Sequence, residues 1–332
     1  MYRSILVPLD GSPFGEHSLP LAVALARRTG AALHLVHVHV PAGPVGALEA
    51  VPYLAAQHEV VIQREHAYLE EARGRLSRLG VPAEARLADG PVARTLAEEA
   101  REAGVDLVVL STHAHLGVSR LWHRGVAAHL TRSLSVPIVL VHAPEGAPAL
   151  DAEPAPRRVL LPLGGKAYSE RVLEHAAELG RAFGARFTLL EVVAPPIEVG
   201  YTLMGQDGHV NEFQLEARRE EALRYLEGVA GGLRARGLEV DAEVVASADA
   251  AEGIVGYAER AAAAGDPVGL IAMETHGLGG AAHLFTPGVV EKVAHQTTIP
   301  VLVHDAAVAE RAHAADDATP RLGWPLHRHG VM

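Results

Sequence analysis

An internal repeat limits how this chain can fold more than any other feature of its sequence. Residues 5–12, Ile-Leu-Val-Pro-Leu-Asp-Gly-Ser, recur as residues 159–166, Val-Leu-Leu-Pro-Leu-Gly-Gly-Lys. A second block, residues 107–114, recurs as residues 270–277, and the spacing between the two blocks is about nine residues longer in the second copy. Similarity at this long period predicts two tandem copies of one domain.

The length of the chain suits this division, because 332 residues allow each copy to bury a core of its own. We assign residues 1–145 to the first domain and residues 157–305 to the second. Residues 146–156 between them are rich in Pro and Ala, which is typical of an extended linker. Residues 306–332 lack apolar periodicity, so we expect a flexible tail.

Each copy alternates short β-branched runs with longer segments of helical periodicity, which predicts parallel strands joined by helices. Continuous apolar runs such as residues 107–110 suit strands that helices cover on both faces. A first helix is expected from near Pro13 to a stop at Gly30, and longer charged helices at 57–79 and 211–236. In the first copy the strands are expected at 4–9, 32–39, 83–88, 105–111 and 136–142. The predicted fold class is α/β, with two Rossmann-like domains, each an open five-stranded parallel sheet flanked by helices.

Open parallel sheets bind ligands beyond the carboxyl ends of their strands, where the strand order reverses. In the first copy three loops converge there, namely residues 9–12, 37–41 and 111–114. Asp10 can offer a carboxylate to an adenine amine or a ribose hydroxyl, and backbone N–H groups near the fourth strand can hold phosphates. The alternative is that Asp10 and Ser12 only cap the first helix.

Composition excludes several classes of function. The formal charge of −11 disfavours nucleic acid and an anionic membrane surface as main partners. The chain has no Cys, which excludes disulfides, thiol catalysis and thiolate metal sites. No P-loop, His-Glu-x-x-His or Gly-x-Ser-x-Gly motif is present. His37 and His39 share one face of a strand, but we favour hydrogen-bonded or solvated histidines over a metal site.

The first residues lack the pattern of a signal peptide, and no apolar run has membrane-spanning length. Together with the absence of Cys, this favours a cytoplasmic location. Around residues 200–204 the second copy carries its insertion, which is either a lid or a surface loop.

The doubled strand-Pro-Leu-Asp-Gly-Ser pattern, with Asp-Leu-Val-Val-Leu-Ser-Thr-His at 106–113 and Val-Pro-Ile-Val at 136–139, resembles the universal stress protein family in its tandem form. The resemblance implies the adenine nucleotide alpha hydrolase-like variant of the Rossmann fold. In nucleotide-binding members the fourth strand leads into Gly-x-x-Gly, nine residues, and then Gly with Ser or Thr, which wrap the phosphates. The positions that the resemblance assigns to nucleotide binding in this chain are Pro8, Leu9, Asp10, Val40, Ser111, Thr112, His113, Ala114, Arg124, Gly125 and Val126.

The first copy departs from that phosphate loop. Ser111 and Ala114 stand at the two early glycines, where each adds a Cβ close to the ligand. Arg124 stands at the third glycine and Gly125 at the hydroxyl position. Arg120 or Arg124 can supply positive charge there, although two arginines four positions apart near a helix start are also typical of a solvated pair.

The second copy departs further. Gly164 replaces the aspartate after the first strand, and Glu274, Gly277, Pro287 and Gly288 occupy the phosphate-loop positions. Glu274 would place a negative charge where a polyphosphate approaches, and Pro287 removes a backbone donor. We therefore expect the second copy not to bind ATP.

The apolar segments 138–142 and 301–304 are expected as the last strand of each sheet, where a free edge would invite aggregation. The resemblance implies that these strands pair around a pseudo-two-fold axis, so that one chain imitates a dimer. The alternative is that the linker or the tail covers them. Association of whole chains into a homodimer is also open.

The predicted function is a tandem universal stress protein, a regulatory binding module with an adenine nucleotide in the first copy, ATP with Mg²⁺ being the ligand considered. No permanent cofactor, protein-bound metal or catalytic residue is expected. One alternative is a nucleotide-free scaffold that acts through unknown protein partners. A second is a slow ATP hydrolase or phosphotransferase with Mg²⁺ and His113 as base, although nothing in the sequence fixes a water-activating group.

Overall fold

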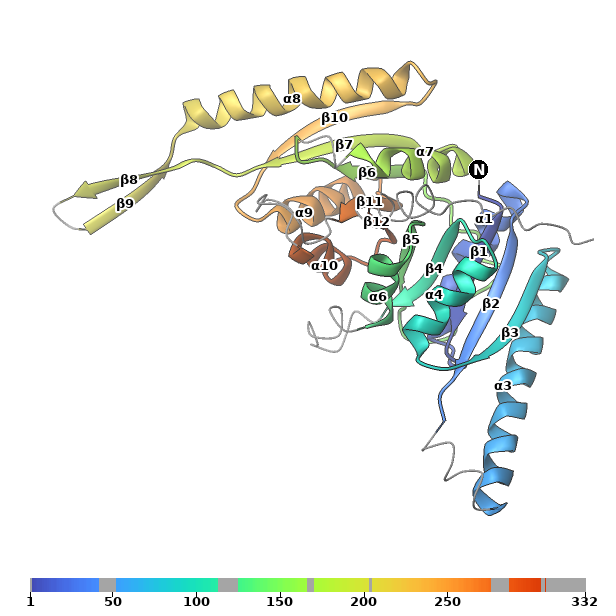
Figure 1. The fold of residues 1–332 in the computed structure, drawn as a ribbon. Coiled ribbons are helices and arrows are strands. Elements are labelled where there is room, and N and C mark those ends of the chain that lie inside the picture. The colour runs from blue at the N-terminus through green and yellow to red at the C-terminus, as the bar shows by residue number, and fades with distance from the viewer. Residues whose placement is uncertain are drawn as a thin grey trace, which may run out of the picture.

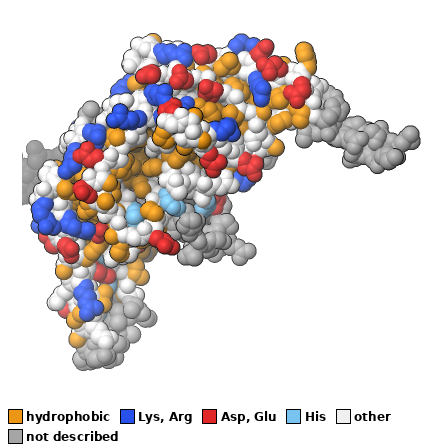
Figure 2. Space-filling model, turned by 180° about the vertical axis from the view of Figure 1, so that it is seen from behind, with side chains coloured by type: hydrophobic (Ala, Val, Ile, Leu, Met, Phe, Trp, Pro, Cys, Tyr) orange, Lys and Arg blue, Asp and Glu red, His pale blue; other side chains and the backbone are white. Residues whose placement is uncertain are grey.

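The computed structural model describes residues 2–41, 52–112, 125–165, 170–202, 205–275, 287–305 and 308. The first repeat contains the strands β1 (Ser4–Leu9), β2 (Ala32–His39), β3 (Ala83–Asp89), β4 (Leu107–Thr112) and β5 (Ile138–His142). The second contains β6 (Arg158–Pro162), β7 (Arg186–Val193), β10 (Val240–Ala246), β11 (Leu270–Thr275) and β12 (Val301–Asp305). Figure 1 shows these strands running through the molecule between the helices, and Figure 2 shows Lys and Arg side chains interspersed with Asp and Glu on the face that is seen from behind.

The ten strands form one sheet in the order β10-β7-β6-β11-β12-β5-β4-β1-β2-β3. Within each repeat all neighbouring strands are parallel, which confirms the predicted fold class. The bounds of β1 and β2 are those expected from the sequence. The fifth strand begins later than expected, at Ile138, because Pro137 has no N–H to donate to the strand ladder.

Helices cover both faces of the sheet. The first repeat has the short 3₁₀ turn η1 (Gly15–Ser18) and helices α1 (Leu19–Thr29), α3 (Pro52–Arg78), α4 (Val92–Glu102) and α6 (Val126–Ser133). The second has α7 (Val172–Phe183), α8 (Glu212–Arg234), α9 (Ala250–Ala263) and α10 (Pro287–Gln296). Helices α1, α3, α7 and α8 pack on one face, and α4, α6, α9 and α10 on the other. None of the helices in the described ranges is long and apolar enough to cross a membrane.

The ends of the first helix in each repeat follow from local chemistry. Gly30 ends α1 and Gly184 ends α7, both with positive φ, a conformation that glycine adopts without strain. The start differs from the expectation, since the chain after Pro13 first forms the 3₁₀ turn and becomes α-helical only at Leu19.

The two repeats join through their last strands, as the family resemblance implied. Strands β5 and β12 pair antiparallel, with Val139 opposite Leu302 at the centre of the pairing. On one face α1 packs against α7, where the Arg28 guanidinium lies 4.9 Å from the centroid of the Phe183 ring. Each apolar layer contains residues of both repeats, so the two copies share their core.

The insertion in the second repeat is a two-stranded hairpin of β8 (Ile197–Thr202) and β9 (Gly205–Val210). It leads into α8, whose N-cap Asn211 accepts a hydrogen bond from the Gln214 N–H. In Figure 1 this hairpin forms an arm that extends outward beyond the start of α8.

A half-buried imidazole lies where the repeats meet. The rings of His175 on α7 and His304 on β12 are 4.5 Å apart, and the Tyr2 hydroxyl of the first repeat donates to the His175 carbonyl. Burial, and then the neighbouring His304, lower the pKa of His175 to about 4. The folded protein therefore disfavours the charged form of this side chain.

Replacing His175 by Leu, the residue at the matching position Leu21 of α1, should change how stability depends on pH. Because the pKa of His175 falls from an ordinary 6.5 to about 4 on folding, its contribution is complete above pH 6.5 and is lost as the pH falls toward 4. After allowance for partial solvent screening, we expect the wild-type chain to lose up to about 2 kcal/mol more than the variant across this interval. Denaturant unfolding at several pH values measures the difference, and parallel pH profiles would contradict it.

Candidate functional site

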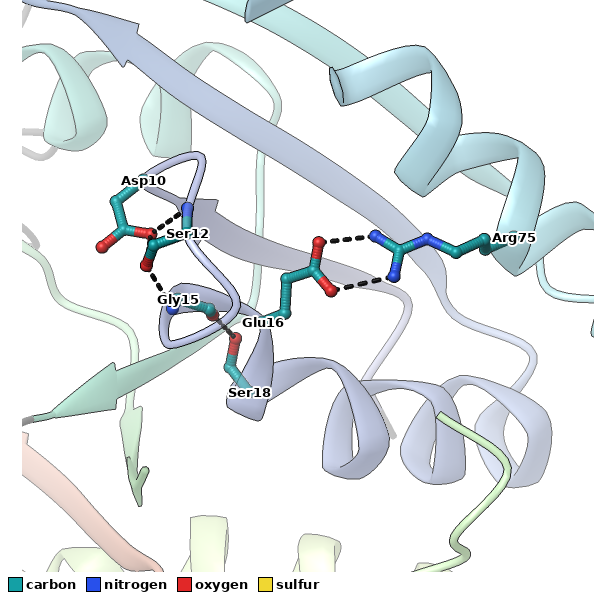
Figure 3. A network of polar contacts seen from close by, with 6 residues as sticks. All are labelled: Asp10, Ser12, Gly15, Glu16, Ser18 and Arg75. Carbon is teal, nitrogen blue, oxygen red and sulfur yellow. Dashed lines mark hydrogen bonds and ion pairs between the residues drawn. The ribbon is translucent and has the colours of Figure 1, made fainter. Parts of the chain in front are cut away.

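The loop after β1 holds its own carboxylate in place (Figure 3). Asp10 Oδ1 accepts hydrogen bonds from the Ser12 N–H at 2.9 Å and from the Ser12 hydroxyl at 2.6 Å. The Ser12 hydroxyl oxygen in turn accepts the Gly15 N–H at 3.2 Å. Asp10 is exposed, and within the described ranges its Oδ2 accepts no hydrogen bond. The loop therefore presents Asp10 Oδ2 at the carboxyl end of β1. Of the two side chains, only that of Ser12 bonds the 3₁₀ turn that follows, through the Gly15 N–H.

Gly15 is where this loop meets β4. Its carbonyl accepts the hydroxyls of Ser18 and Ser111, each at 3.0 Å. A Cβ added at Gly15 would lie 2.3 Å from Asp10 Oδ1, so only glycine leaves room for the observed carboxylate position. The hydroxyl of Ser111, which the sequence assigns to a phosphate-loop position, bonds the end of β4 to the loop that carries Asp10.

The other predicted residues in the described ranges lie at the same edge of the sheet. Pro8 and Leu9 end β1, Thr112 ends β4, and Val40 follows β2 with 62% of its surface exposed. Gly125 precedes α6, which begins at Val126. Among the described residues, no side chain is placed to cap the first N–H groups of α6, which are the kind of donors that bind anions. The predicted residues His113, Ala114 and Arg124 lie outside the described residues.

A partly buried ion pair behind the loop was not predicted from the sequence. The Arg75 guanidinium of α3 donates to both carboxylate oxygens of Glu16, at 2.9 and 2.5 Å (Figure 3). Burial, and then the Glu16 carboxylate, raise the pKa of the nearby Tyr68 hydroxyl. In the second repeat the Tyr225 hydroxyl donates to Glu170 at 2.9 Å. The repetition of Glu16 as Glu170 was the sequence signal that could have revealed this contact.

A second unforeseen cluster joins β2 to α3. Glu65 of α3 lies between two histidines of β2, with Oε2 2.7 Å from His39 Nδ1 and Oε1 3.4 Å from His37 Nε2. His37 Nδ1 also bonds the Leu9 carbonyl at 2.8 Å. His37 and His39 share a face, as expected. Across the described ranges, no group of three or more His, Asp or Glu side chains is arranged to hold a metal ion.

The matching edge of the second repeat has different chemistry. Gly164 follows β6, so no carboxylate occupies the Asp10 position. Glu191 occupies the register position of His37, and its carboxyl pKa is raised by burial and then by Glu221. Gly165 lies beside it, where an added Cβ would be 3.5 Å from Glu191 Oε1.

Glu274 differs from its sequence interpretation. It was expected to face an approaching polyphosphate, but it is only 4% exposed and its Oε2 lies 3.1 Å from His304 Nδ1. The two residues are register partners on β11 and β12. Glu274 is thus part of the buried joint between the repeats rather than a charge in the open crevice.

Comparison with known proteins agrees with this arrangement. The model of the universal stress protein family matches residues 1–142 and again residues 156–304. The chain belongs to the universal stress protein family. Both repeats are therefore universal stress protein domains.

Some similar proteins match one repeat of this chain, and others match both repeats. Universal stress protein YxiE of Bacillus subtilis is 27% identical over 147 residues, which are 42% of this chain and 99% of that protein. A universal stress protein structure from Archaeoglobus fulgidus covers 91% of this chain and 96% of its own, with 15% identity and a TM-score of 0.63. A structure from Pseudomonas aeruginosa UCBPP-PA14 covers 94% and 98%, with 16% identity and a TM-score of 0.56. These structures share the tandem fold.

Replacing Gly15 by Ala should destabilise the first repeat. The new methyl group would overlap Asp10 Oδ1 and force the loop to shift, which typically costs about 1–3 kcal/mol. The matched control is Gly74→Ala in α3, where an added Cβ meets nothing within 4 Å. This control should be neutral or stabilising by about 0.5–1 kcal/mol. Chemical denaturation compares the two, and equal stability of Gly15→Ala and wild type would contradict the tight contact.

Proposed function

We propose that this universal stress protein is a stress-response module that binds one adenine nucleotide in the crevice of its first repeat. The observation that carries the proposal is the exposed carboxylate of Asp10, whose Oδ1 is held by Ser12 at the carboxyl end of β1 and whose Oδ2 accepts no hydrogen bond from the described residues. A ligand at this edge of a parallel sheet meets the ends of several strands at once. Gly164 offers no such group in the second repeat.

Each part of the nucleotide has a proposed partner. Asp10 accepts a hydrogen bond from the base amine or a ribose hydroxyl, and the backbone of exposed Val40 borders the base. The uncapped first turn of α6, from Gly125 and Val126, holds phosphate oxygens through its N–H groups.

We propose ATP with Mg²⁺ as the ligand. The chain carries a formal charge of −11, so partial neutralisation of the phosphates by Mg²⁺ lowers their repulsion from the protein. Because the described residues hold no cluster suited to a metal, the ion arrives on the phosphates rather than in a protein cage. It is then released with the nucleotide.

Calorimetric titration of the whole chain with Mg-ATP should give a stoichiometry near one nucleotide per chain. Asp10→Ala should weaken binding about 10- to 100-fold, the usual effect of losing a hydrogen bond to a charged group. The matched control is Asp151→Ala in the exposed linker, which should bind as the wild type does. A stoichiometry of two would contradict the inactive second crevice.

Two other results would overturn the proposal. Unchanged affinity of Asp10→Ala would remove Asp10 from the site. The absence of binding at millimolar Mg-ATP would instead favour a nucleotide-free scaffold, and the search would turn to partner proteins.

A further inference from the structure

The carboxylate of Glu65 and the two imidazoles of β2 form a clamp, which we call the β2–α3 clamp and define as His37, His39 and Glu65. His39 is 2% exposed and His37 is 8% exposed. The clamp lies directly behind the proposed nucleotide loop, because His37 Nδ1 bonds the carbonyl of Leu9, the residue before Asp10. An added Cβ on Gly11 of that loop would be 3.7 Å from His37 Cε1.

The contacts of His37 determine which of its two ring nitrogens must donate a proton. The Leu9 carbonyl can only accept, so His37 Nδ1 must donate to it. His37 Nε2 faces Glu65 Oε1 at 3.4 Å, and a neutral ring would turn a lone pair toward that carboxylate. When Glu65 is ionised, an attractive contact on both sides of the ring needs a proton on both ring nitrogens.

We propose that protonation of His37 closes this clamp and tightens nucleotide binding in the first crevice, so that the module binds its ligand more strongly in acid than in alkali. This inference rests on the function proposed above. When the proton is lost, the attraction between His37 and Glu65 across their 3.4 Å contact is lost with it, and α3 no longer restrains His37 against the Leu9 carbonyl. Histidine is the side chain that changes charge between pH 5 and 8.

The charged and titratable groups around the clamp come from each element packed on it. From α3, Glu65 and Tyr68 face His37, and His58 lies 4.8 Å from the His39 ring. From β3, exposed Asp89 is the register partner of His39. The next ion pair along α3, Arg75 with Glu16, is satisfied in both carboxylate oxygens. Glu65 is the acceptor that both imidazoles share.

The second repeat lacks this device. Glu191 stands at the position of His37, and Val193 at the position of His39. The proton-dependent clamp thus occurs in the repeat that keeps the aspartate, which links it to ligand binding rather than to the shared fold.

The test measures Mg-ATP affinity of the full chain at pH 6 and pH 8 for wild type, His37→Asn and a control. Asn keeps a donor for the Leu9 carbonyl but takes up no proton. We expect the affinity of the wild type, divided by the affinity of His37→Asn at the same pH, to be about fivefold higher at pH 6 than at pH 8. Taking the ratio of variant to wild type at each pH cancels the titration of the nucleotide itself. The control is His34→Asn, a histidine of the same strand paired with exposed Glu84, which should keep the wild-type pH profile.

Glu65→Gln should flatten the profile as His37→Asn does. A His37→Asn profile with the full wild-type slope would overturn the clamp. Amide hydrogen exchange of residues 9–15 in the ligand-free chain provides a readout that needs no nucleotide. If Mg-ATP binds at neither pH, the proposed function fails. The closing of the clamp is then judged by hydrogen exchange alone: the amides of residues 9–15 should be better protected at pH 6 than at pH 8 in the wild type but not in His37→Asn, and equal protection in both proteins would overturn it.

Discussion

The antiparallel pairing of β5 with β12 is the contact on which the rest of the structure depends. Each repeat ends in an apolar strand that would otherwise expose a row of unpaired N–H and C=O groups. Pairing the two strands satisfies these groups and makes one sheet of ten strands. It also brings α1 against α7 and lets each apolar layer run through both repeats. A shared core then holds the sheet edges of the two repeats in a fixed relation.

When the two repeats are compared position by position, some residues match and others do not. The tyrosine near a glutamate recurs, as Tyr68 with Glu16 and Tyr225 with Glu170. These pairs join the long helix to the first loop, which both copies need in order to pack. The residues that differ lie at the open edge, where Gly164 replaces Asp10 and Glu191 replaces His37. The tyrosine–glutamate pairs are alike because both repeats need them for packing. The residues at the open edge are free to differ, and with them the chemistry that the edge offers to a ligand.

The sequence was sufficient for most features that depend on local chemistry, apart from the starts of β5 and of the first helix. Alternating runs and helix-stop glycines such as Gly30 predicted the strands, and the repeat predicted two domains. The position of Asp10 followed from its place after β1. By contrast, the contacts of Arg75 and Glu65 depend on how α3 lies against the sheet, and amphipathic periodicity does not set that rotation. Glu274 was misread for the same reason, since its buried partner His304 belongs to a strand distant in sequence.

The linker has a consequence for how such a protein can change over time. It runs beside η1 and α1, where the Gly146 carbonyl bonds His17 of η1 and Glu153 pairs with Arg27 of α1. In a symmetric dimer of single-domain chains, every substitution appears in both crevices at once, because both are encoded by the same gene segment. Here each crevice has its own codons. A substitution in one repeat can therefore change the chemistry of its own sheet edge, while the other repeat and the joint between them stay as they are.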